Sequence, residues 1–106
     1  MLEKEYQAYL IKKIRTQVLP GAVVLKNDTQ YRQGIPDLTV LYYERWGVLE
    51  VKASATAPER PNQDYYIDLL DGMSYAAFIF PENEQEILYE LQQSLSPKRP
   101  ARLSKS

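Results

Sequence analysis

The sequence predicts an α/β domain whose elements follow one another as helix, three strands, helix, strand and helix. Three stretches carry apolar residues at helical spacing, and four short apolar runs between them are typical of strands. A chain of 106 residues supports one domain with one core. We therefore expect a single domain over residues 1–97, followed by a basic, flexible tail over residues 98–106.

The first predicted helix covers residues 2–18, where apolar side chains return every three or four positions. Pro20 and Gly21 end it, because both residues break helices. The apolar run at 22–26 then predicts a strand, and the polar stretch at 27–34 predicts a loop.

A hairpin follows this loop, with strands predicted at 38–43 and 46–52 and a polar turn at 44–45. Asp37 stands directly before the first of these strands, and Glu50 lies near the end of the second. Because the two strands are of similar length, we expect the hairpin to bring both acids to the same end of the sheet.

The rest of the chain supplies the remaining layers. Asn62 is expected to cap a helix that ends before Gly72, a natural C-terminal stop. The continuous apolar run at 75–80 predicts a buried strand, and a Glu-rich helix is predicted at 82–94. Four side chains are expected to form the apolar stripe of the middle helix: Tyr65, Tyr66, Leu69 and Leu70.

Composition excludes several kinds of chemistry. The chain has no cysteine, which excludes disulfides, thiolate-bound zinc and a cysteine nucleophile. It has no histidine, which excludes imidazole metal ligands and Ser-His triads. Any catalysis must therefore use carboxylates, lysine, tyrosine and a bound metal. No apolar stretch is long enough to span a bilayer, and the acid-containing start has no apolar signal core. These features favour an intracellular protein.

Charge is distributed unevenly, although the formal net charge is only −1. The tail from residue 98 holds Lys98, Arg99, Arg102 and Lys105 without any acid, so it carries +4. The remaining residues hold nine basic and fourteen acidic side chains, a net charge of −5. The tail is suited to contact phosphate, although a basic end of this kind is also typical of a plain disordered tail.

Asp37, Glu50 and Lys52 form the candidate catalytic constellation. Two carboxylates at one sheet edge suit a hard divalent cation, Mg²⁺ or Mn²⁺, and the main-chain carbonyl of Val51 could complete part of its oxygen shell. Lys52 would either orient a water molecule or stabilise the developing charge, and the sequence does not separate these roles. The competing interpretation is a solvated strand face, since exposed strand faces are normally charged.

A third acid would help to hold the cation, and the first helix offers two. On a helical wheel Glu3 falls inside the apolar stripe, whereas Glu5 falls well away from it. A buried glutamate is costly unless it is paired or bound to metal, so Glu3 is the choice and Glu5 the reserve. The alternative is that Glu3 is only a first-turn acid, which the helix dipole favours at that position. Gln63 is a further candidate, for metal-bound water or phosphate.

Two basic residues are candidates for contacts with the phosphates of a nucleic-acid backbone. Lys26 ends the predicted strand at 22–26, and Arg32 lies in the loop before Asp37. Ordinary solvated charge is the default interpretation of each. Five tyrosines could stack on unpaired bases: Tyr31, Tyr42, Tyr43, Tyr65 and Tyr66. Core or subunit-interface positions are the more usual roles of those in the hairpin and the helix.

At this point the chain resembles the PD-(D/E)xK nuclease superfamily, and within it the virus-type replication-repair nucleases (the VRR-NUC domain). The order Gly-x-Pro-Asp, Glu-x-Lys and a helix-opening Gln is a specific signal. The similar stretches cover most of residues 2–80: Leu2-Glu3-Lys4-Glu5-Tyr6 with Leu10, Lys26, Gly34-Ile35-Pro36-Asp37, Leu49-Glu50-Val51-Lys52-Ala53, Gln63 and Leu69-Leu70-Asp71-Gly72. Family members often carry Arg before this Gly; here Gln33 takes the place, and Arg32 is a possible substitute.

The resemblance implies a three-layer α/β nuclease core of order αβββαβ plus a C-terminal helix. It implies one or two Mg²⁺ or Mn²⁺ ions held by Glu3, Asp37 and Glu50, with Lys52 as the catalytic lysine and Gln63 completing the site. It also implies a homodimer that cuts branched DNA such as four-way junctions, in a bacterial or phage-infected cell. Two rivals stay open: a nucleic-acid-binding module without activity, and a non-enzymatic interaction protein.

Overall fold

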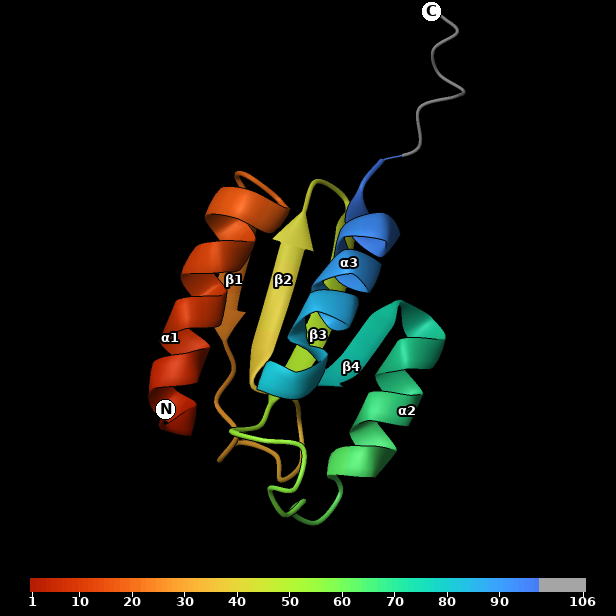
Figure 1. The fold of residues 1–106 in the computed structure, drawn as a ribbon. Helices are drawn as coiled ribbons and strands as arrows, with labels where there is room; N and C mark the ends of the chain where they lie inside the picture. The colour runs from red at the N-terminus through yellow and green to blue at the C-terminus, as the bar shows by residue number, and fades with distance from the viewer. Residues whose placement is uncertain (98–106) are drawn as a thin grey trace, which may run out of the picture.

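A four-stranded mixed sheet forms the centre of the fold, with its strands side by side in the order β1-β2-β3-β4 (Figure 1). The computed structural model describes residues 1–97, so the expected basic tail lies outside the described residues. The strands are β1 (Val23–Lys26), β2 (Leu38–Tyr42), β3 (Arg45–Val51) and β4 (Tyr75–Ile79). The helical segments are α1 (Glu3–Lys13), η1 (Ile14–Val18), α2 (Gln63–Met73), η2 (Pro81–Asn83) and α3 (Glu84–Leu95).

This arrangement confirms the predicted α/β class and the predicted order of elements. The β1–β2 and β2–β3 pairs are antiparallel, and β4 lies parallel to β3 after the α2 crossover. Among the described residues, no helix combines the length and apolar character needed to cross a membrane.

Two layers of helices cover opposite faces of the sheet (Figure 1). Side chains alternate between faces along a strand, so Leu49 and Val51 point to one face, while Val48 points to the other. The first face packs against α1 and α3 in the main core, and the second packs against α2 around Ile67. Glu50 and Lys52 alternate with Leu49 and Val51, so they belong to the α2 face.

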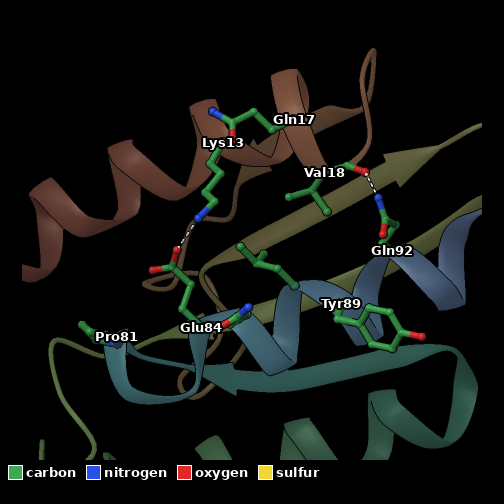
Figure 2. Close-up of a pocket in the computed structure, with 9 residues that line it drawn as sticks. Lys13, Gln17, Val18, Pro81, Glu84, Tyr89 and Gln92 are labelled. Atoms are coloured by element: carbon green, nitrogen blue, oxygen red, sulfur yellow. Dashed lines mark hydrogen bonds and ion pairs between the residues drawn. The ribbon is translucent and has the colours of Figure 1, made fainter.

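Polar contacts tie α1 and η1 to α3 on the first face (Figure 2). The Lys13 ammonium lies 2.9 Å from the Glu84 carboxylate, and the Gln92 amide donates a 2.8 Å hydrogen bond to the carbonyl of Val18. A cavity of about 560 Å³ lies between these helices. None of the candidate catalytic residues lines this cavity, so it is separate from them.

The predicted hairpin turn at 44–45 is wrong by one residue. Tyr42 pairs with Arg45, so Tyr43 and Glu44 form the turn, and Tyr43 adopts a φ of +57°. The pairing places Leu38 opposite Leu49, and both side chains are fully buried. Continued by one residue, this register places Asp37 beside Glu50.

The helices differ from the prediction in three details. The last turn of the first helix, η1, is a π-helix, and the Thr16 hydroxyl donates a hydrogen bond to the carbonyl of Lys12, a contact that perturbs helices. The middle helix runs through Gly72 to Met73, so Gly72 does not stop it. The expected apolar stripe of that helix is only partly right, because Tyr65 and Leu69 are exposed.

Candidate functional site

Three of the predicted site residues line one small cavity at the edge of the sheet. Asp37 precedes β2, Glu50 lies in β3, and Gln63 is the first residue of α2. The cavity has a volume of about 210 Å³. The strand register and the parallel crossover thus bring together side chains from three parts of the sequence. The complete lining is Thr29, Gln33, Gly34, Ile35, Asp37, Glu50, Arg60 and Gln63.

Asp37 is held by the main chain around it. One of its carboxylate oxygens, Oδ2, accepts a 2.9 Å hydrogen bond from the N–H of Val51. Asn27 fixes the turn before it, because its amide donates to the carbonyl of Pro36 and its own N–H donates to the carbonyl of Asp37. Thr39 in turn donates to the side-chain oxygen of Asn27. The carboxylate therefore sits on a braced turn rather than on a free loop.

Glu50 is the residue of the site whose ionised form is least favourable. Its side chain is buried, with 2 % of its surface exposed. Its Oε1 is the one buried side-chain nitrogen or oxygen within residues 1–97 that has no hydrogen-bond partner. Burial, followed by the nearby Asp37 charge, raises the pKa of Glu50 to about 8, although the Lys52 ammonium acts to lower it. A proton or a cation is needed to neutralise this buried carboxylate.

Gln63 connects Glu50 to Lys52. Its amide nitrogen donates a 2.7 Å hydrogen bond to Glu50 Oε2, and its oxygen accepts a 2.6 Å hydrogen bond from Lys52 Nζ. The amide orientation is fixed by chemistry, because an ammonium only donates and a carboxylate only accepts. Gln63 is also 4 % exposed, so the contact is shielded from water.

Lys52 is buried, and its ammonium makes two hydrogen bonds, to Gln63 and to the carbonyl of Pro58 at 3.0 Å. An ammonium has three donors, so one N–H is left for another acceptor. Lys52 does not line the acidic cavity; it lines a neighbouring one of about 110 Å³. In this structure the Gln63 amide therefore stands between the lysine and the carboxylates.

A close approach of two backbones closes the cavity. Gly34 has a φ of +94°, and a Cβ atom added to it would stand 2.7 Å from the carbonyl carbon of Asn62. Asn62 itself adopts a left-handed conformation and makes no side-chain capping bond, so its expected capping role is wrong in that respect. Only glycine allows the loop before Asp37 to rest on the start of α2 in this way.

The two candidate acids of α1 are placed differently from each other. Glu3 is half-buried, and its charge contributes to the raised pKa of Glu50. Glu5 is exposed and accepts a 3.1 Å hydrogen bond from the N–H of Leu2. However, no three acidic side chains within residues 1–97 are grouped closely enough to hold one metal ion. The helix α1 packs with α3 on one face of the sheet, whereas Glu50 belongs to the other face.

The remaining predicted residues lie around the site without entering the cavity. Val51 contacts Asp37 through its main-chain N–H, and its side chain belongs to the core. Lys26 is exposed at the end of β1, next to the turn that carries Asp37. Arg32 is also exposed, and its guanidinium contacts the hydroxyl of Tyr66 at 3.4 Å and stands over the ring of Tyr31.

Arg60 is the residue that sequence reasoning missed. It is the single basic residue that lines the acidic cavity, and its backbone N–H donates a 2.8 Å hydrogen bond to Gln63 Oε1. Gln33 lines the cavity as well, whereas Arg32 does not. The position of Arg60 three residues before Gln63 is the only signal that could have pointed to it, because the segment otherwise looks like a proline-interrupted loop.

No family model, curated protein or solved structure matches this chain. Its assignment therefore depends on the site itself.

One observation in particular indicates that the residues of this site suit a divalent cation. Glu50 presents a buried oxygen without a partner beside a second carboxylate, and hard cations take such oxygens as ligands. Asp37 and Glu50 are the two acids that line the cavity, so one ion bound there could contact both. Glu3 is the other acid whose charge acts on Glu50. To bind the same cation, its side chain would have to reach around the end of the sheet.

Proposed function

We propose that this protein is a metal-dependent DNA endonuclease with a three-layer core of the PD-(D/E)xK type. The observation that supports the proposal is the buried Glu50 carboxylate beside the half-buried Asp37, with one Glu50 oxygen left without a partner, next to a lysine and a glutamine. A protein gains no stability from a buried carboxylate placed beside a second carboxylate, so this placement points to a ligand.

In this proposal Asp37 and Glu50 hold Mg²⁺ or Mn²⁺, with Glu3 and the carbonyl of Val51 as further candidate ligands. The bound ion supplies charge neutralisation at the phosphate and a more acidic water. Hydrolysis adds the oxygen of water to phosphorus and breaks the bond to the 3′ oxygen, which leaves a 5′-phosphate and a 3′-hydroxyl.

The protein's own side chains position the reactants. Lys52 keeps one free N–H, which suits it to hold the attacking water or a phosphate oxygen. Gln63 accepts a hydrogen bond from Lys52 and donates one to Glu50, so it fixes the lysine relative to the glutamate. Arg60 lines the cavity with no acidic partner in the described part of the chain, so it is placed to bind a phosphate oxygen of the substrate.

The finer features of the proposal come from the resemblance. It implies selectivity for branched DNA such as four-way junctions, a homodimer with two sites, and a role in a bacterial or phage-infected cell. A 12.3 kDa chain has little surface with which to hold a junction, which favours a dimer.

The test is cleavage of a labelled four-way junction, with linear duplex and single strand as comparisons. Each is incubated with Mg²⁺, with Mn²⁺ and with a chelator. We expect metal-dependent cleavage by the unmodified protein, and at least a hundred-fold loss, on the order of 3 kcal/mol in activation free energy, for Asp37→Asn and Lys52→Met. Glu86→Gln is the matched control, because Glu86 is exposed on α3 and lines none of the cavities at the site.

The outcomes separate the rival functions. DNA binding by all variants without cleavage by any would identify an inactive binding module. Neither binding nor cleavage would identify an interaction protein and remove the proposal. Cleavage that persists in the chelator would contradict the assigned chemistry, because the carboxylates would then have no cation to hold.

A further inference from the structure

A second groove lies along the outer edge of the sheet, between α1 and β1. Its volume is about 520 Å³. β1 is an edge strand, so its outer side has no strand neighbour within the described residues. Basic side chains dominate the polar part of the lining, which consists of Ala8, Ile11, Lys12, Arg15, Ala22, Val23, Val24 and Lys26.

The charge of this groove is unusual for the molecule. Lys12, Arg15 and Lys26 are three of the nine basic residues among positions 1–97, where acids outnumber bases by five. All three are exposed, no acid lines the groove, and none of the three forms an ion pair within the described residues. Lys4 extends the row, because it lies eight positions before Lys12 and so shares its side of α1. Positive charge is thus concentrated on a domain that is otherwise negative.

The groove leads to the candidate active site. Lys26 pairs with Leu38 across the β1–β2 ladder, and Leu38 directly follows Asp37. At the other end, Lys12 stands nine residues along α1 from Glu3, or about 14 Å at 1.5 Å per residue. One DNA strand presents a phosphate about every 3.4 Å along the duplex axis, so this distance corresponds to roughly four nucleotides.

We infer that this groove binds the sugar–phosphate backbone of the DNA substrate on one side of the cut, with Lys12 and Arg15 as positioning residues. The inference rests on the proposed function and adds to it the path of the substrate strand. The partner is a polyanion, because an acid-free row of unpaired cations attracts one. An acidic polypeptide that adds a strand to β1 is the competing partner.

The experiment measures junction cleavage kinetics with Mn²⁺ over a series of salt concentrations. The double variant Lys12→Gln/Arg15→Gln removes two phosphate contacts. Each contact contributes a salt slope of about 0.9, or about eight-fold in affinity at 0.1 M salt. We expect KM to rise by roughly fifty-fold, the slope of log KM against log salt to fall by about two, and kcat to stay unchanged.

Two variants control for charge and for structure. Arg45→Gln removes a positive charge at the start of β3, away from the groove lining, and should leave KM and the salt slope unchanged. Lys12→Arg/Arg15→Lys keeps both charges on the same helix face and should restore the unmodified KM.

Each outcome decides the inference. An active unmodified protein whose KM and salt slope survive the double glutamine substitution would overturn the inference and leave the proposed function standing. An equal loss from Arg45→Gln would also overturn it, since the effect would then come from net charge alone. If the double variant keeps its cleavage kinetics on DNA but no longer binds a poly-glutamate peptide that the unmodified protein binds, the groove is assigned to an acidic polypeptide instead. An unmodified protein that cuts no DNA would remove both proposals together.

Discussion

Replacement of Glu50 by glutamine should stabilise the protein at neutral and alkaline pH. The substitution keeps the shape of the side chain, preserves an acceptor for the Gln63 amide and gives the site a donor that can face Asp37. It removes a buried negative charge that has a partnerless oxygen. The gain should therefore appear only at pH values where Glu50 of the unfolded chain is ionised, which lie above its ordinary pKa.

The size of the effect follows from linkage. The pKa of Glu50 is raised from 4.5 to about 8 in the folded protein, chiefly by burial. A carboxyl whose pKa is raised on folding weakens the fold as pH climbs from the unfolded pKa to the folded one, and has no effect below both. At roughly 1.4 kcal/mol per pH unit, the raised pKa of Glu50 lowers the free energy of unfolding by about 3 kcal/mol at pH 7 as an upper value.

Urea unfolding without divalent metal, at pH 4 and pH 8, measures this difference. We expect Glu50→Gln to gain about 2–3 kcal/mol in free energy of unfolding at pH 8 and almost nothing at pH 4. Glu86→Gln, an exposed control, should change by less than about 0.5 kcal/mol at both values. Destabilisation at pH 8, or an equal gain at both pH values, would refute the reasoning.

Three further predictions concern the scaffold, each read by urea unfolding. Gly34→Ala forces the loop away from the Asn62 backbone and should lose about 2–4 kcal/mol, with a parallel loss of any divalent-metal affinity; an unchanged midpoint would contradict the close approach. Glu84 is half-buried; burial alone would raise its pKa, but hydrogen bonds from Lys13 and two tyrosines lower it, so Glu84→Gln should lose about 1–2 kcal/mol at pH 7 and less as pH falls below 4. Leu91→Ala opens a void in the main core and should cost about 2–4 kcal/mol at any pH.

Much of the fold follows from local pattern. Apolar periodicity places the helices and strands within a few residues, because the same spacing that marks an element in the sequence decides which face is buried. The last helix illustrates this, since its apolar residues recur at helical spacing and three of them are buried: Ile87, Leu88 and Leu91.

The hairpin register could not be obtained in the same way. The predicted turn at 44–45 and the observed turn at Tyr43–Glu44 differ by one residue. This difference changes the strand pairing by two residues, which keeps every side chain on its expected face. Neither turn contains the Gly or Asn that would mark it. The choice is made by packing across the sheet, which no local pattern records.

The end of α2 shows another limit. Gly72 is a natural stop, yet the helix continues because tertiary contacts define its end: Ser74 donates a hydrogen bond to the carbonyl of Trp46, and Asp71 accepts one from the N–H of Ala76. These bonds join the helix to β3 and β4, and their partners are distant in the sequence or depend on the strand that follows.

In the candidate site, too, some residues can be predicted from local spacing and others depend on tertiary contacts. Asp37, Glu50 and Gln63 follow from spacing, because the hairpin and the next helix must meet at one sheet edge. Arg60 is not predicted by local pattern, since it lies in a proline-interrupted loop whose backbone bonds to Gln63 beside the cavity. The expectation for Glu3 was incomplete, because a helical wheel shows which face is buried and does not show from which side of the sheet α1 approaches.

The most direct test of the central claim is a Mn²⁺ titration, followed by calorimetry or by the loss of the free-ion paramagnetic resonance signal. We predict saturable binding to the unmodified protein, at least a ten-fold weaker affinity for Asp37→Asn and for Glu50→Gln, and an unchanged affinity for Glu86→Gln. Binding that is absent in the unmodified protein, or that is equally strong in all four proteins, would contradict the assignment of the two carboxylates to a cation.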